Sequence, residues 1–168
     1  DGFFVLNTQG GYNDYIATEA QGSAANFTVV MTDVDTVDAS ASSLSLIIFG
    51  GRDGDTITMG SGNDIVFGDR GRVIYYDEAG QIVTVLGNGG MGDYTDGLVR
   101  DPVRLYTVDP EIGGNDVINT KLDEYPASDD IVFGGQARDE IHVGDGNNVV
   151  IGDLGFIDYV IDDGEHTS

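Results

Sequence analysis

The sequence contains no cysteine and no tryptophan, and positive charge is scarce in it. The absence of cysteine excludes disulfide bonds and thiolate metal sites. Only 7 lysines and arginines accompany 30 aspartates and glutamates, which gives a formal net charge of −23 at pH 7. A chain of this charge repels phosphate groups, so we expect no nucleic acid and no anionic membrane among its partners.

Long hydrophobic runs and catalytic motifs are also missing. No segment is apolar over the length that a bilayer span needs, so we expect no transmembrane segment. The 2 histidines, His142 and His166, lie far apart and near no nucleophile motif. The chain lacks the G-x-S-x-G, H-E-x-x-H and P-loop patterns. We therefore predict that it is not an enzyme.

Glycine, by contrast, is abundant, with 26 residues, and it recurs in a nonapeptide pattern. Residues 49–71 divide into successive nonapeptides with glycine in the first half, aspartate at place six and an aliphatic residue at place eight. Asp55 and Asp64 occupy place six, and Ile57 and Val66 occupy place eight. The pattern matches G-G-x-G-x-D-x-U-x, and the stretch resembles the calcium-binding repeats of RTX proteins.

The chemistry of this nonapeptide fits a parallel β-roll. Each aliphatic side chain points inward from a short strand, and each glycine-rich half forms a turn whose carbonyl oxygens can converge. Calcium takes six to eight oxygen ligands, so two turns stacked on the same side can share one ion. We predict an all-β fold of parallel β-roll, or β-solenoid, coils with inserted antiparallel β-hairpins and glycine-rich loops. The expected cofactor is calcium, as several ions.

The candidate calcium ligands are eight side chains and four glycines of the turns. They are Asp55, Asp64, Asp69, Asp116, Asp130, Asp139, Asn148 and Asp153, with Gly50, Gly60, Gly134 and Gly144. We expect Asp55 to share a site with the turn of Asp69. Asp116 should share one with the turn of Asp139, and Asp139 one with the turn of Asp153.

Stacking should also couple metal binding to folding. Carboxylates on neighbouring turns would lie roughly 4.8 Å apart and repel one another. We therefore expect the roll to fold together with its ions. Asn148 offers a neutral oxygen where aspartate is usual, so the second group of repeats, within residues 111–155, should bind calcium more weakly than the first.

The sequence repeats itself at an offset of 84 residues, half of its length of 168. Phe49 corresponds to Phe133, Asp55 to Asp139 and Val66 to Val150, among others. We predict two units of this type. The first, residues 1–86, comprises an N-terminal strand, a β-roll over 27–71 and a hairpin over 72–86. The second, residues 87–168, comprises a loop over 87–110, a β-roll over 111–155 and an unpaired hairpin strand over 156–161.

The chain thus starts and stops inside one hairpin. Residues 3–6 resemble the second hairpin strand and residues 156–161 the first, so each lacks its mate. We expect strand complementation, in which the C-terminal strand pairs with the N-terminal strand of another copy, head to tail, or of an adjacent repeat unit. The chain opens at Asp1, and we expect a mature product, a fragment or a unit excised from an array.

Places seven and nine of each nonapeptide predict the outer faces of the two sheets of the roll. One sheet would be apolar outside, through Ile47, Phe49, Ile65, Phe67, Ile131, Phe133, Val149 and Ile151. The other would carry Thr56, Thr58, Glu140 and His142. An apolar face of that extent is not left in water, so the hairpins or a partner subunit should cover the first sheet.

These features lead to one leading functional hypothesis. We expect a secreted, calcium-stabilised structural or adhesive repeat module that forms a rod or filament subunit on the bacterial exterior. The resemblance implies a repeat unit of a large surface protein, an adhesin, or an extracellular filament protein, at the cell surface or beyond it. One alternative is the calcium-dependent folding and secretion module of a larger secreted enzyme or toxin. Another is a lectin-like module that binds ligands through Tyr12, Tyr15 and Tyr94.

Overall fold

The computed structural model describes residues 4–7, 15–17, 29–31, 34–87, 92–98, 100–120 and 127–159. Every regular element in these ranges is a β-strand, and no helix that could span a bilayer occurs in them. The strands are β1 (Phe4–Asn7), β2 (Tyr15–Ala17), β3 (Val29–Met31), β4 (Thr36–Asp38), β5 (Leu46–Phe49), β6 (Thr56–Thr58), β7 (Ile65–Phe67), β8 (Gly71–Tyr76), β9 (Ile82–Leu86), β10 (Arg104–Thr107), β11 (Val117–Asn119), β12 (Ile131–Phe133), β13 (Glu140–His142), β14 (Val149–Ile151) and β15 (Phe156–Asp158).

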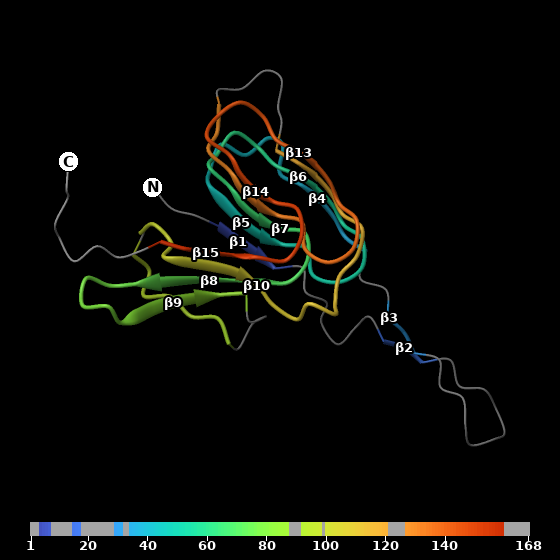
Figure 1. The fold of residues 1–168 in the computed structure, drawn as a ribbon, viewed down its shortest axis with the longest axis horizontal. Coiled ribbons are helices and arrows are strands. Elements are labelled where there is room, and N and C mark those ends of the chain that lie inside the picture. Colours follow the sequence, from blue (N-terminus) through green and yellow to red (C-terminus); the bar gives the residue numbers. More distant parts are fainter. Residues whose placement is uncertain are drawn as a thin grey trace.

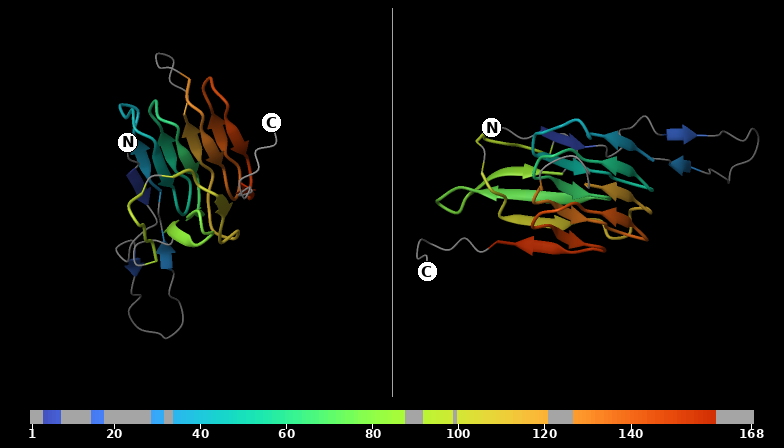
Figure 2. Two further views of the ribbon diagram at one scale, coloured as in Figure 1. Left: turned by 90° about the vertical axis from the view of Figure 1, so that its left-hand side faces the viewer. Right: turned by 90° about the horizontal axis from the view of Figure 1, so that it is seen from above.

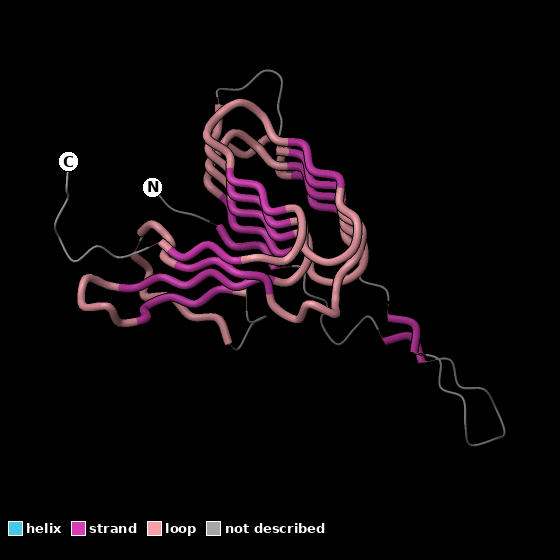
Figure 3. The backbone as a smooth tube through the Cα atoms, in the orientation of Figure 1, coloured by secondary structure: helices cyan, strands magenta, loops and turns pink. Residues whose placement is uncertain are grey.

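Two parallel sheets face each other and form a β-roll (Figures 1 and 3). The first, with order β1-β5-β7-β12-β14, is called here the five-stranded sheet, and the second, with order β13-β11-β6-β4, the opposite sheet. From β4 to β7 and again from β11 to β14 the chain alternates between them, so each pair of strands is one coil. The side chains between the sheets form an inner core of Leu46, Ile48, Ile57, Met59, Val66, Ile118 and Val132.

The two expected roll segments join into one roll. β12 lies beside β7, where Val132 pairs with Val66, and β11 lies beside β6, where Ile118 pairs with Ile57. The predicted all-β roll with inserted antiparallel strands is therefore confirmed. The expected start at residue 27 is wrong, because β3 pairs antiparallel with β2 and the first strand of the opposite sheet is β4.

A third, antiparallel sheet has the order β15-β10-β8-β9. Its strands β8 and β9 form the hairpin expected over 72–86. The expected loop over 87–110 is partly wrong, because it contains β10, a strand of four residues that is too short to show a clear alternation. The strand expected to be unpaired over 156–161 is also corrected: β15 pairs with β10, where Tyr106 faces Phe156.

The N-terminal strand has a partner inside the chain as well. β1 runs parallel to β5, and Val5 pairs with Ile47 and Leu6 with Ile48. The interpretation of residues 3–6 as a hairpin strand without a mate is therefore wrong. The backbone N–H and C=O groups along the edge of β5 can bond to any extended segment. The sequence similarity between residues 3–6 and β9 could therefore not show which strand β1 would pair with.

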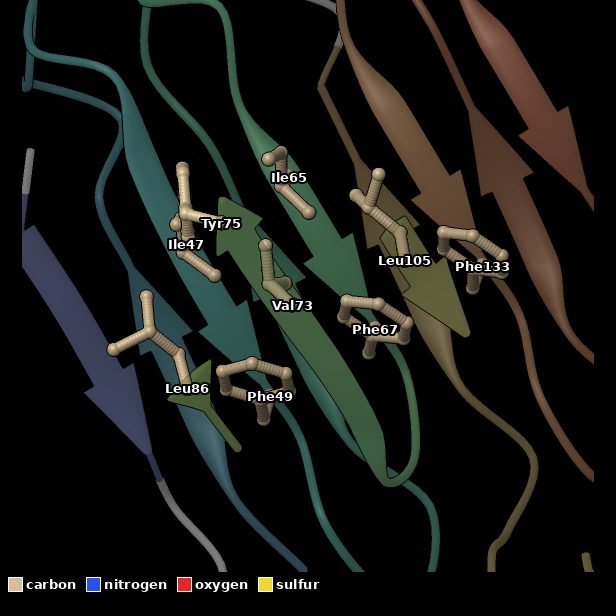
Figure 4. Packing of buried hydrophobic residues seen from close by; sticks show 9 residues of the cluster. All are labelled: Ile47, Phe49, Ile65, Phe67, Val73, Tyr75, Leu86, Leu105 and Phe133. Atoms are coloured by element: carbon tan, nitrogen blue, oxygen red, sulfur yellow. The ribbon is translucent and has the colours of Figure 1, made fainter. Parts of the chain in front are cut away.

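The antiparallel sheet covers the outer face of the five-stranded sheet (Figures 2 and 4). Ile47, Phe49, Ile65, Phe67 and Phe133 pack from the five-stranded sheet against Val73, Tyr75, Leu86 and Leu105 of the antiparallel sheet. The Phe67 ring is stacked between the rings of Phe49 and Phe133, with centroid distances of 5.1 and 4.5 Å. The predicted faces are confirmed. Of the two covers expected for the apolar face, hairpins or a partner subunit, the structure shows the antiparallel sheet over this cluster, while Val149 of the same face stays exposed.

Replacing Phe67 with serine should destabilise the molecule strongly. The ring is 1% exposed, and loss of a buried phenylalanine costs about 3–5 kcal/mol. Thr56, on the outer face of the opposite sheet, is exposed, so Thr56→Ser should leave stability nearly unchanged. Thermal unfolding with saturating calcium measures both. Equal melting temperatures for the two variants would contradict the layer arrangement.

Candidate calcium sites along the roll

One edge of the roll, called here the first edge, carries a ladder of aspartates. These residues precede the strands of the opposite sheet, and each carboxylate accepts the backbone N–H of its counterpart one coil earlier. Asp35 N–H donates to Asp55 at 2.7 Å, Asp55 N–H to Asp116 at 2.7 Å, and Asp116 N–H to Asp139 at 3.0 Å. Each bond uses Oδ1 of the carboxylate and holds the next coil in register.

The second carboxylate oxygens of this ladder point into spaces that only glycine leaves open. A methyl group on Gly134 would overlap the Gly152 carbonyl oxygen and lie 2.5 Å from Asp139 Oδ2. One on Gly68 would overlap Asp116 Oδ2 and the Gly134 carbonyl oxygen. The structure thus brings each aspartate to the carbonyl of a turn stacked beyond it.

The same geometry recurs at the first coil. A methyl group on Gly50 would overlap the Gly68 carbonyl oxygen and lie 2.5 Å from Asp55 Oδ2. Asp55 therefore lies against the turn of Asp69, as the nonapeptide spacing predicts. The first edge repeats one arrangement three times, with Asp55, Asp116 and Asp139 as its carboxylates.

These oxygen pairs have the chemistry of a hard-cation site. Oδ2 of Asp116 and Oδ2 of Asp139 are buried without a hydrogen-bond donor, and burying such a group without a partner is costly. In the described ranges no three His, Cys, Asp or Glu side chains cluster as a metal site. An ion here would therefore draw on carbonyl oxygens as well as carboxylates, as calcium does. The residues present fit calcium.

The second edge of the roll carries a shorter ladder. Leu46 N–H donates to Asp64 at 2.8 Å, Asp64 N–H to Asp130 at 3.0 Å, and Asp130 N–H to Asn148 at 2.9 Å. Asp64 Oδ2 is buried without a donor. On the same edge, a methyl group on Gly60 would overlap the Ser42 carbonyl oxygen and come 2.9 Å from that of Ala39.

The remaining candidates of the second edge are engaged within the protein. Asp130 Oδ2 accepts the Ser128 hydroxyl at 3.0 Å. Asn148 Nδ2 donates to the Gly144 carbonyl at 2.9 Å. Hydrogen bonds that already use these groups leave Asp64 as the carboxylate of this edge best placed for an ion.

Asp69 has a different role from the one that its motif predicts. Its carboxylate accepts the backbone N–H of Gly114 at 2.9 Å and, at a shorter distance, that of Gln136. Because backbone amides engage both oxygens, we interpret Asp69 as a clamp between turns, and the structure does not support it as a calcium ligand. Its partners lie 45 and 67 residues away, so no local signal could reveal them. Its counterpart Asp153 is exposed.

Burial raises the pKa of several of these carboxyl groups. The pKa of Asp116 rises to about 8 and that of Asp64 to about 7, in both cases mainly because burial disfavours the charged form. Neighbouring carboxylates add to the effect, and a backbone hydrogen bond opposes it. Burial also raises the pKa of Asp69 to about 6 and that of Asp139 above its usual value. Without a cation, the fold therefore favours protonation of Asp64 and Asp116.

Comparison with known proteins agrees with this geometry. The model of the RTX calcium-binding nonapeptide repeat matches residues 47–74 and 127–156, in 4 copies. These two segments are RTX calcium-binding repeats. RTX nonapeptide repeats bind calcium ions, so calcium is the cofactor. The RTX match does not include Asp116, but the ladder shows that the coil of Asp116 has the same arrangement. No match was found among curated proteins or solved structures.

Asp116→Asn should weaken calcium binding while keeping the ladder. The amide oxygen can still accept the Asp55 N–H, whereas the amide nitrogen replaces the unpartnered Oδ2. We expect affinity at the affected site to fall on the order of tenfold, or about 1.4 kcal/mol, as measured by calorimetric titration. Asp101 is exposed, and Asp101→Asn is the matched control. Equal affinities for the two variants would remove Asp116 from the ligand set.

The metal-free protein should lose stability as the pH rises. An acid whose pKa is raised by folding contributes most below its unfolded pKa, and that contribution is lost as the pH passes the folded value. For Asp64 and Asp116, stability should therefore fall between about pH 4, the ordinary pKa of an aspartate, and about pH 8, the raised pKa of Asp116. Calcium affinity should rise over the same window, because protons compete for the ligands.

Far-UV circular dichroism of metal-free protein from pH 5 to pH 8 tests this pH dependence. The β-sheet signal should be larger at pH 5 and fall as the pH rises, and Asp116→Asn should reduce the difference while Asp101→Asn preserves it. A signal that is larger at pH 8 would show that Asp64 and Asp116 are not desolvated as the structure implies.

Proposed function

We propose that this chain is a secreted structural module of a bacterial surface protein or filament, which completes its fold when it meets calcium outside the cell. The observation that carries the proposal is the pair of carboxylate ladders. Neighbouring carboxylates at roughly 4.8 Å repel by about 3–4 kcal/mol at an effective dielectric near 20. A bound cation removes this repulsion and joins successive coils, so calcium binding and folding are one process.

The shape of the roll supports a structural role. Coils stack in one direction, and the candidate calcium sites lie along both edges of the stack, where bound ions would stiffen it. The antiparallel sheet adds a third layer along the same direction (Figure 2). Among the described strands, β13 and β14 end their sheets, and their outer edges suit continuation by further repeats. A calcium-stiffened rod, in a filament or an adhesin, is the function that uses all of these features.

The same ladders support a second candidate, the calcium-dependent folding module of a larger secreted enzyme or toxin. A chain that stays unfolded at the low calcium level of the cytosol and folds outside would be suited to export. This candidate requires folding on calcium but no resistance to load. Pulling single molecules discriminates the two: a structural module should show a high unfolding force that falls sharply on chelation.

Removal of calcium should unfold the roll. We expect excess chelator to abolish the β-sheet signal in far-UV circular dichroism, and calcium to restore it. Magnesium should be a poor substitute because it demands tighter octahedral geometry. The metal-free comparison belongs at pH 8, where the ladders are most charged. An unchanged spectrum in excess chelator at that pH would refute calcium-coupled folding.

A further inference from the structure

The five-stranded sheet has one strand more than the opposite sheet, and the extra strand is β1. The other strands form four coils, namely β4 with β5, β6 with β7, β11 with β12 and β13 with β14. β1 belongs to none of these coils. It lies parallel on the edge of β5 that faces away from β7. β1 therefore covers the end of the stack in this sheet.

In the middle of the roll, the edge that corresponds to this edge of β5 pairs with another strand of the roll. β12 is the counterpart of β5 at the 84-residue offset, and its corresponding edge is held by β7. Ile65 pairs there with Ile131, and Val66 with Val132. β14 is in turn the counterpart of β7. A β14 from another molecule would therefore fit β5 in the way that β7 fits β12.

The far end of the roll, at β14, is left incomplete among the described residues. Val66 of β7 is 0% exposed, whereas its counterpart Val150 is 44% exposed although it lies at an inward place. Val149 and Leu154 are exposed nearby, and Phe156 is 73% exposed. Exposed apolar side chains at the end of a sheet with an unpaired edge favour the addition of a strand.

We propose that copies of this chain join head to tail by strand exchange, in which β14 of one copy displaces β1 from β5 of the next. All strands of the five-stranded sheet are parallel, so translation along the stack keeps every strand direction. Without β1, both sheets of the roll contribute four strands per copy and continue together. The occupant of the incomplete end is thus a second copy of the same chain.

The first-edge ladder continues across this junction. β13 of one copy would lie beside β4 of the next, as β6 lies beside β11 within the chain. The backbone N–H of Asp139 would then meet the carboxylate of Asp35, as that of Asp116 meets Asp139. Because each copy carries a net charge of −23, the junction requires the calcium-loaded roll. To that extent the inference rests on the proposed function.

Two prolines in β1 test the exchange in the chain of 168 residues. Successive backbone N–H groups of a strand point to opposite edges, so Val5→Pro with Leu6→Pro removes a donor toward β5. The double variant with calcium should assemble at a protein concentration at least tenfold below that of the unaltered chain, as measured by sedimentation velocity. A peptide of residues 1–7 added in excess should reverse the assembly.

Point variants identify the surface. Val150→Asp in the proline variant should prevent assembly, while Leu98→Asp, at another exposed aliphatic residue, should not. The proline variant with Val150→Asp keeps an open β5, so mixing it with the unaltered chain should give a complex that stops at one copy of each. Assembly that Val150→Asp does not reduce would overturn the proposal.

Circular dichroism on each sample separates this inference from the function on which it rests. A proline variant that folds on calcium but stays monomeric refutes strand exchange and leaves the calcium-dependent module intact. If the prolines prevent folding, the test is sedimentation velocity of the unaltered chain at high concentration with calcium. It should associate, Val150→Asp should abolish that association, and a monodisperse sample would overturn the proposal.

Discussion

Carboxylates stacked at one strand spacing are the constraint on which the rest of this structure depends. The hydrogen bonds from one aspartate N–H to the next carboxylate hold coils in register, but each uses one oxygen and leaves the other facing a carbonyl. Glycines are required at the facing positions because a side chain would fill the space between those oxygens. Calcium fits this arrangement, since carboxylate and carbonyl oxygens are the ligands that it takes.

A second constraint is the thinness of the roll. Each coil contributes only a few inward side chains, such as Ile57 and Val66, so the inner core cannot supply much hydrophobic stabilisation. The chain compensates with a second apolar layer outside the five-stranded sheet, centred on the stacked rings of Phe49, Phe67 and Phe133. The antiparallel sheet is therefore part of the core of the protein as well as an insertion between repeats.

The insertion is attached to the roll by specific polar contacts at its base. Asp69 lies two residues after the end of β7 and accepts N–H groups from the turn before β11 and from the turn after β12. The chain leaves the roll at β7 and returns at β11, and this carboxylate joins the two sides of that interruption. Arg70, close by, forms an ion pair with Asp109, near the point of return. These contacts let a long excursion interrupt the stack without breaking its register.

The sequence by itself determined the elements that depend on local spacing. The nonapeptide places Ile57 and Val66 inside, Phe49 and Phe67 on an apolar outer face, and Asp55 beside the turn of Asp69, because strand alternation and turn chemistry act within a few residues. Tertiary structure alone decided which strands share edges. β1 pairs with β5, β10 lies between β8 and β15, and Asp69 accepts backbone N–H groups from two distant turns. Backbone edges are chemically alike, so these choices follow from which segments the completed roll brings together.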